Sequence, residues 1–181
     1  FIQRNNFMKE VQLHDKRFAI SIDAAKIDKA VQNVADKINI DYKDKNPLFL
    51  VVLNGAFMFA SDLLKKVTIE CEISFVKLSS YSGTTSNHVV RELIGLDEAL
   101  TNRNVIVVED IIDTGITMEN TIYKLKHLQA NDVRIATLLY KPLAFRKDYA
   151  IDYIGMEIDN DFIVGYGLDY DGLGRNLPDI Y

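Results

Sequence analysis

The chain has 181 residues, with 48% hydrophobic and 26% charged side chains and a formal net charge of −5 at pH 7. This balance excludes disordered, collagen-like and low-complexity chains, and the length predicts one domain. The acidic charge argues against nucleic acid as a partner, because a nucleic-acid surface usually needs clustered Lys and Arg.

Two further features of the composition bear on location. The longest continuous apolar run is Leu48–Leu53, far shorter than the roughly 20 residues that span a bilayer, so we expect no membrane partner. Cys71 is the single cysteine and cannot form an internal disulfide. A reduced thiol of this kind is typical of cytoplasmic proteins, and we expect a cytoplasmic location.

Apolar periodicity predicts helices and strands in alternation. Ile27, Val31, Val34 and Ile38 recur on one helical face, and Asp23 is placed to cap that helix. The pattern further predicts strands at residues 48–53, 73–78, 105–108, 133–139, 153–158 and 162–164, and helices near residues 58–65 and 118–129. Because continuous apolar strands separated by helices are typical of a parallel sheet covered on both faces, we expect a single α/β domain.

Two segments interrupt this alternation. Residues 79–87 (SSYSGTTSN) are nearly all small and polar, which predicts a mobile loop. Residues 165–174 (GYGLDYDGLG) hold four of the nine glycines, which permit positive φ angles and close backbone approach to another group. Composition alone leaves open whether each segment is an ordinary surface loop or part of a site.

The most informative segment is VIVVEDIIDTGIT, residues 105–117, in which a buried strand runs into Glu109 and Asp110 and then into a turn with Asp113. Ligands of open parallel sheets bind beyond the carboxyl ends of the strands. The turn offers Thr hydroxyls, backbone N–H groups and a helix N-terminus, which together bind phosphate. Carboxylates fit beside a phosphate when Mg²⁺ intervenes or when they contact sugar hydroxyls. The segment therefore predicts a phosphorylated sugar with Mg²⁺.

Spacing disfavours most other phosphate sites. The chain has no Gly-Lys pair for a P-loop and no complete G-x-G-x-x-G for a dinucleotide. Asp110 and Asp113 are three apart rather than two, which disfavours a D-x-D phosphatase nucleophile. Two alternatives stay open: a receiver-type phospho-acceptor domain, which also places acids at strand ends, and a helix N-terminus whose acids complement the macrodipole.

Five motifs in order resemble the type I phosphoribosyltransferases, and most closely their hypoxanthine (hypoxanthine-guanine) branch. VVEDIIDTGIT (residues 107–117) resembles the phosphoribosyl-diphosphate signature, and LNGAF (residues 53–57) resembles the early pyrophosphate loop. Ser80 and Tyr81 resemble the start of the flexible lid. LLYK (residues 138–141), and the segment from FIVGY (residues 162–166) through LDY (residues 168–170) to Arg175, resemble the purine-binding hood.

The resemblance runs from about residue 10 to the end of the chain and implies the type I phosphoribosyltransferase fold. This is an α/β fold with a central, mostly parallel sheet flanked by helices. It implies one domain over residues 1–181, with a core at about 40–150 and a small hood built from about 10–25 and 150–181. The implied reaction is Mg²⁺-dependent transfer of ribose 5-phosphate from phosphoribosyl diphosphate (PRPP) to hypoxanthine and also guanine, which gives IMP or GMP and pyrophosphate.

The same resemblance implies a role for each motif residue. Asp113 is the general acid/base that exchanges the proton at purine N7, and Lys141 donates to the 6-oxo oxygen. The residues implied for ribose and 5′-phosphate are Glu109, Asp110, Asp113, Thr114, Gly115, Ile116 and Thr117. Those implied for the purine are Lys141, Phe162, Ile163 and Asp169, and those for pyrophosphate are Asn54, Gly55, Ser80, Tyr81 and Arg175. The implied Mg²⁺ ligands are Glu109, Asp110 and Asp169.

One departure and three questions remain. Many members of the family carry Lys or Arg where this chain has Asn54, so a charge that could contact pyrophosphate is absent. A second hypothesis is a regulator on the same fold that contacts RNA, although RNA binding would need a basic face. The resemblance implies a homodimer or homotetramer without deciding between them. The order of preference among hypoxanthine, guanine and xanthine also stays open.

Overall fold

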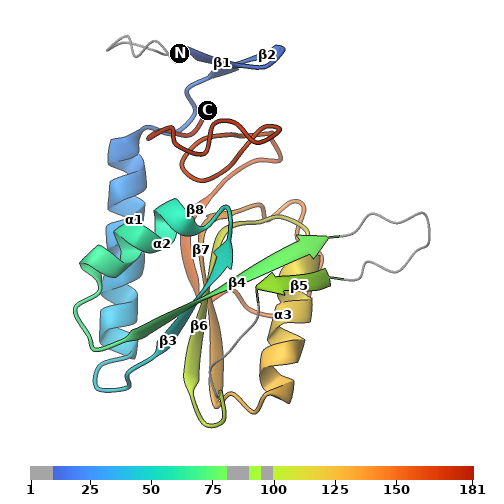
Figure 1. Cartoon of the computed structure of the whole chain (residues 1–181). Helices are drawn as coiled ribbons and strands as arrows, with labels where there is room; N and C mark the ends of the chain where they lie inside the picture. The colour runs from blue at the N-terminus through green and yellow to red at the C-terminus, as the bar shows by residue number, and fades with distance from the viewer. Residues whose placement is uncertain (1–9, 81–89, 95–99) are drawn as a thin grey trace.

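The computed structural model describes the backbone of residues 10–80, 90–94 and 100–181 (Figure 1). Helices and strands alternate through most of the chain. In order they are β1 (Glu10–Leu13), β2 (Lys16–Ala19), α1 (Ala24–Asp41), β3 (Leu48–Leu53), α2 (Phe57–Lys66), β4 (Glu72–Ser80), β5 (Val90–Ile94), β6 (Asn104–Ile112), α3 (Ile116–His127), β7 (Asp132–Tyr140) and β8 (Tyr153–Glu157). No helix among these residues is long and apolar enough to cross a membrane.

A six-stranded sheet in the order β5-β4-β3-β6-β7-β8 forms the centre of the molecule. All neighbouring pairs are parallel except β4 and β5, which are antiparallel. Strand β3 is buried almost throughout because both of its faces are covered, as its continuous apolar sequence predicts. The expected α/β class with a mostly parallel sheet is therefore confirmed. The carboxyl ends of the parallel strands meet at the upper edge of the sheet in Figure 1.

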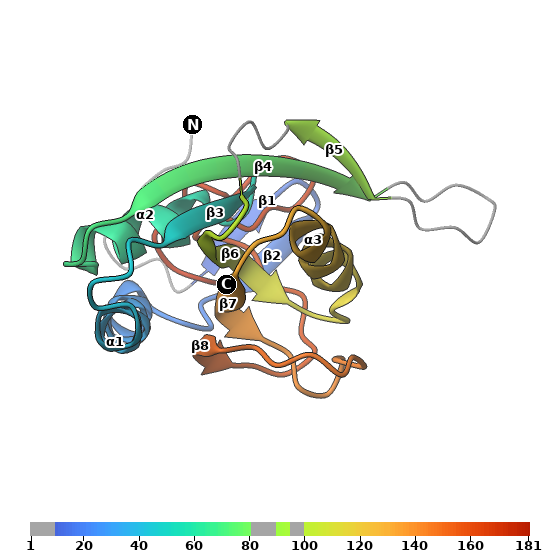
Figure 2. The same cartoon turned by 90° about the horizontal axis from the view of Figure 1, so that it is seen from below.

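Helices cover both faces of this sheet. Helices α1 and α2 lie together on one face and α3 lies on the other, as the view from below shows (Figure 2). Helix α1 begins where expected, because the Asp23 side chain accepts a hydrogen bond from the backbone N–H of Lys26 at 2.8 Å. Its apolar stripe is buried against the sheet and α2, through Ile27, Ala30, Val31, Val34, Ala35 and Ile38.

A small hood lies above the carboxyl edge of the sheet and joins segments from both parts of the chain (Figure 1). The β1–β2 hairpin packs against the C-terminal segment around a separate apolar cluster of Val11, Leu13, Phe18, Val164, Leu177 and Tyr181. Backbone hydrogen bonds link Ile22 to Ile180 and Val164 to Tyr181. Segments distant in sequence thus build the wall that faces the strand ends.

The structure corrects several element predictions. Residues 162–164 form no strand; Val164 instead pairs with Tyr181, and Gly165, Tyr166 and Gly167 all have positive φ, so the chain turns there. Strand β6 continues through Ile112, so that Glu109 and Asp110 lie within the strand rather than after it. The periodicity also missed β1, β2 and β5, which are only four or five residues long. Most of the predicted loop at 79–87 lies outside the described residues.

Candidate functional site

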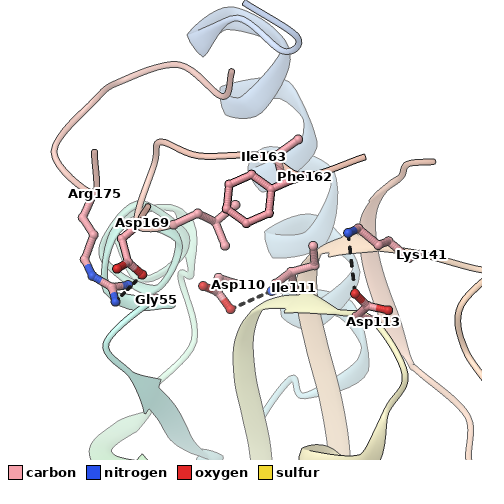
Figure 3. Close-up of a pocket in the computed structure, with 10 residues that line it drawn as sticks. Gly55, Asp110, Ile111, Asp113, Lys141, Phe162, Ile163, Asp169 and Arg175 are labelled. Carbon is pink, nitrogen blue, oxygen red and sulfur yellow. Dashed lines mark hydrogen bonds and ion pairs between the residues drawn. The ribbon is translucent and has the colours of Figure 1, made fainter. Parts of the chain in front are cut away.

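A pocket of about 400 Å³ opens between the strand ends and the hood (Figure 3). The ends of β6 and β7 and the loop after β3 form its floor and sides, and the hood forms its roof. Its lining residues are Gly55, Asp110, Ile111, Asp113, Lys141, Phe162, Ile163, Leu168, Asp169 and Arg175. The pocket therefore lies where an open parallel sheet binds its ligand.

A second, smaller cavity of about 120 Å³ adjoins the pocket at the turn between β6 and α3. We call it the turn cavity; its lining residues are Glu109, Ile111, Ile112, Asp113, Thr114, Gly115, Ile116, Thr117 and Met118. Gly115 caps α3 in the left-handed conformation (φ 83°) and supplies no side-chain hydrogen bond to the helix. The first N–H groups of α3 lack the kind of carboxylate cap that Asp23 gives α1, which suits them to bind an anion.

Two opposite charges share one side of the larger pocket. The Nζ atom of Lys141 lies 3.6 Å from Oδ2 of Asp113, and the two side chains point toward each other at one side of the pocket (Figure 3). Lys141 is only 8% exposed, and its backbone N–H donates to the carbonyl of Ile112 at 3.0 Å. The β7 terminus and the turn after β6 thus hold an ammonium donor and a carboxylate side by side.

The loop after β3 approaches the hood and β6 very closely. A Cβ atom at Gly55 would overlap the Asp110 carboxylate, and one at Gly167 would overlap the Gly55 carbonyl oxygen. Gly167 has φ 100°, a conformation that glycine adopts most readily. The peptide bond between Leu53 and Asn54 is cis. Both glycines are therefore required by the space between three chain segments.

The hood wall presents one aromatic ring to the pocket. Phe162 is 62% exposed, and its ring packs edge-on against Tyr170 and beside Phe18, with centroid distances of 5.8 and 6.1 Å. Next to it, Arg175 pairs with Asp169 at 2.6 Å and donates to the Gly167 carbonyl at 2.7 Å. An exposed ring held from behind is suited to stacking on a planar ligand.

The two acids of β6 carry unusual electrostatics. Burial, together with the neighbouring charge of Asp110, raises the pKa of Glu109 well above its ordinary value. Burial also raises the pKa of Asp110, although hydrogen bonds with Glu109 and with the backbone N–H of Ile111 oppose that rise. Strand alternation sends the two side chains to different cavities, Asp110 to the pocket and Glu109 to the turn cavity. A cation or a donor-rich ligand at the boundary would relieve this unfavourable burial of charge.

Most of the residues proposed from sequence are brought to these two cavities. The exceptions are Asn54, which is exposed and lines neither cavity, Ser80, whose side chain is not described, and Tyr81, which lies outside the described residues. Sequence reasoning missed Ile111 and Leu168, which line the pocket with apolar side chains. Both lie inside the quoted motifs, but an aliphatic residue there carries no chemical signal of its own.

The donor set of the site fits Mg²⁺ only in part. Across the described ranges, no three His, Cys, Asp or Glu residues are placed to hold a metal ion on their own. Glu109 and Asp110 nevertheless supply carboxylate oxygens at the boundary of the cavities. Since Mg²⁺ is usually held by one or two carboxylates together with substrate phosphates and water, this set fits a metal that arrives with its substrate.

Comparison with known proteins identifies close relatives of this chain. A model of the phosphoribosyl transferase domain matches residues 21–171. The chain is 46% identical over 143 residues to a hypoxanthine-guanine phosphoribosyltransferase of Streptococcus agalactiae, covering 78% of this chain and 79% of that protein. It is 36% identical over 160 residues to the enzyme of that name from Bacillus subtilis, covering 88% and 89%.

Solved structures agree with the sequence relatives. A hypoxanthine-guanine phosphoribosyltransferase of Bacillus anthracis with a HEPES molecule in its active site superposes with a TM-score of 0.86, 34% identity, and coverage of 90% of this chain and 96% of that one. A hypoxanthine phosphoribosyltransferase of Trypanosoma cruzi, in a ternary substrates complex, gives a TM-score of 0.83, 34% identity, and coverage of 89% and 92%.

The raised pKa of Glu109 predicts a pH-dependent cost to stability in the ligand-free protein. Between the ordinary pKa and the raised folded pKa, the folded state binds more protons than the unfolded state, so stability falls as pH rises through that window. Glu109→Gln should therefore raise the melting temperature at neutral pH, and this gain should disappear as the pH falls below about 4.5. Thermal unfolding in metal-free buffer across this range measures the effect.

Glu70→Gln is the matched control, because Glu70 is an exposed glutamate away from the site. Its melting temperature should follow that of the unaltered protein at every pH. A Glu109→Gln difference that is the same at low and neutral pH would show that the buried charge does not cause the effect.

Proposed function

The chain belongs to the phosphoribosyltransferase family, and from this membership and its pocket we propose that it is a hypoxanthine phosphoribosyltransferase of purine salvage. In this reaction ribose 5-phosphate passes from PRPP to hypoxanthine, and also to guanine, with release of pyrophosphate. The family match covers residues 21–171, and the relatives named above carry this activity in their names. The assignment of substrates to each cavity is argued below from the geometry of the site.

The Lys141–Asp113 pair is the observation that carries the proposal. The 6-oxo oxygen and N7 of a 6-oxopurine lie next to each other on one edge of the base. An ammonium, which only donates, matches the oxygen, and a carboxylate beside it matches a protonated N7. The two groups lie 3.6 Å apart in the pocket. The amino group of adenine would face a donor there, so the pair favours hypoxanthine and guanine over adenine.

The remaining purine contacts come from the hood. The exposed Phe162 ring offers a stacking surface above the pocket (Figure 3). We assign the backbone carbonyls of Ile163 and Asp169 to the far edge of the base, since both residues line the same pocket as Lys141.

The 5′-phosphate is assigned to the turn cavity. Thr114 and Thr117 supply hydroxyls, and the backbone from Gly115 to Thr117 supplies N–H groups at the start of α3. The helix N-terminus favours a negative charge at this position. Because Glu109 lines the turn cavity and Asp110 lines the adjoining pocket, we assign the ribose hydroxyls to these carboxylates.

Pyrophosphate is assigned to the side of the pocket formed by Gly55 and Arg175. The planar guanidinium of Arg175 is suited to phosphate oxygens, and Gly55 lines the same pocket. Asn54 and the lid residues Ser80 and Tyr81 stay predicted contacts, because the described contacts place none of them in the pocket.

We assign Mg²⁺ to Glu109 and Asp110, and the proposed contact of Asp169 with a second ion stays a prediction. The ion would neutralise the charge on the diphosphate oxygens that lie near these acids. In the transfer itself, the purine nitrogen bonds to the ribose carbon as the bond from that carbon to pyrophosphate oxygen breaks. Asp113 accepts the proton that leaves N7, and Lys141 holds the 6-oxo oxygen.

An absorbance assay with hypoxanthine, PRPP and Mg²⁺ tests the proposed function. We expect IMP formation that stops in excess chelator and returns when Mg²⁺ is added back, because the diphosphate and the β6 acids repel each other without a cation. Adenine in place of hypoxanthine should give little product. Failure to form IMP or GMP under full conditions would refute the function, and full turnover in chelator would refute the metal requirement.

Asp113→Asn tests the proton acceptor. The change keeps the shape of the side chain and removes its ability to accept the N7 proton, so kcat should fall by about 10²–10⁴-fold with little change in the KM for PRPP. Steady-state kinetics measures both constants. Asp148→Asn, an exposed aspartate in the loop after β7, is the control and should leave kcat unchanged. A near-normal kcat for Asp113→Asn would assign proton transfer elsewhere.

We also propose that the chain forms a homodimer or homotetramer and works in the cytoplasm. Ile73 and Phe75 on β4 are 43% and 41% exposed, on the sheet face that carries α2. Paired apolar side chains at this position favour a contact between subunits. Phe75→Asp should therefore lower the particle mass in sedimentation experiments, whereas Ile40→Asp, at an exposed position of α1, should not. A protein that is monomeric before any substitution would contradict the proposal.

A further inference from the structure

The loop of residues 142–150, between Lys141 and β8, lies across the start of α3; we call it the strap. Its side chains close around Gly115, where an added Cβ would meet the Phe145 ring and the Tyr149 hydroxyl at 2.6 Å each and Lys147 at 3.0 Å. The strap makes two polar contacts with this turn. The Tyr149 hydroxyl donates to the Gly115 carbonyl at 2.8 Å, and Lys147 pairs with Glu119 at 2.6 Å.

The Tyr149 hydrogen bond controls the direction of a peptide group. The Gly115 carbonyl also accepts the first helical hydrogen bond of α3, from the Glu119 N–H at 3.0 Å, so a donor in the helix and a donor in the strap together hold this oxygen. In a trans peptide the C=O and the following N–H point in opposite directions. Fixing the Gly115 carbonyl therefore fixes the Ile116 N–H, and Ile116 lines the turn cavity.

We propose that Tyr149 is a positioning residue for the 5′-phosphate, and that its hydroxyl holds the peptide of Gly115 and Ile116 with the N–H aimed into the turn cavity. The inference rests on the proposed function for the identity of the phosphate ligand. Tyr149 touches no substrate in this arrangement. It acts instead through the backbone at the start of α3. That helix start has no side-chain cap, and its N-cap residue is a glycine in the left-handed conformation.

The surroundings of Tyr149 suit it to this role. Its ring packs edge-on against Phe145 at 5.2 Å, and Phe145 packs in the same way against Tyr140 of β7 at 5.5 Å. Burial, and next the negative charge of Glu119, raise the pKa of the Tyr149 phenol, so the hydroxyl keeps its proton and donates. The Lys147–Glu119 pair is more exposed and contributes less, because exposed ion pairs are screened by water.

Tyr149→Phe is the test, because it keeps the aromatic packing and removes only the hydrogen bond. We expect the IMP dissociation constant from titration calorimetry, and the KM for PRPP, to rise about 3- to 10-fold. The KM for hypoxanthine should not change, since Lys141 and the ring packing are retained. Tyr123→Phe, at an exposed tyrosine on α3, is the control and should alter none of these values.

The outcomes separate the inference from the proposed function. Unchanged IMP affinity and unchanged PRPP KM in Tyr149→Phe would overturn the inference. So would an equal rise in the KM values for PRPP and hypoxanthine, which would indicate general damage to the strap. An unaltered protein that binds IMP but forms none from hypoxanthine and PRPP would refute the proposed function, and the IMP titrations would still decide the role of Tyr149. An unaltered protein that does not bind IMP would overturn both.

Discussion

The pocket depends on a close backbone contact between two segments, the turn of the hood at residues 165–167 and the loop after β3. Gly167 lies against the carbonyl of Gly55, and neither residue has room for a Cβ. Arg175 holds the turn from the other side through the Gly167 carbonyl, and the Tyr166 hydroxyl donates to Asp62 of α2 at 2.7 Å. The distance between the base-binding wall and the strand ends is therefore set by backbone atoms, which shift less readily than side chains.

Burying the acidic side chains of the site lowers the stability of the ligand-free protein. Glu109 and Asp110 are drawn into a poorly solvated position at the end of β6, and their pKa values rise because the charged forms are disfavoured there. Such burial is typical of functional sites, where a ligand of complementary charge repays the desolvation of the side chains. Lys141 and Asp113 are arranged differently, because each is the other's ion-pair partner at 3.6 Å.

Much of the fold could be predicted because long apolar runs leave few alternatives. Strand β3 begins and ends at its predicted residues, and Asp23 caps α1 as expected. The candidate site was predicted from the acidic motif that contains Asp113, whereas Lys141 was proposed only through the family resemblance. The short hairpin strands were missed because their pattern is too brief, and 162–164 looked like a strand because apolar side chains also line irregular walls. Tyr149 had no motif around it, and only its contact with Gly115 reveals a role.

The hood has a core of its own, separate from the two apolar clusters that stabilise the sheet. Phe162, which we propose stacks on the base, is supported by Phe18 of the hairpin and by Tyr170, both of which belong to or pack on that small core. Local unfolding free energies can differ widely within one domain. Because this small core is separate from the core of the sheet, a substitution in the β1–β2 hairpin that weakens it would be expected to loosen the wall that carries Phe162 more than the sheet.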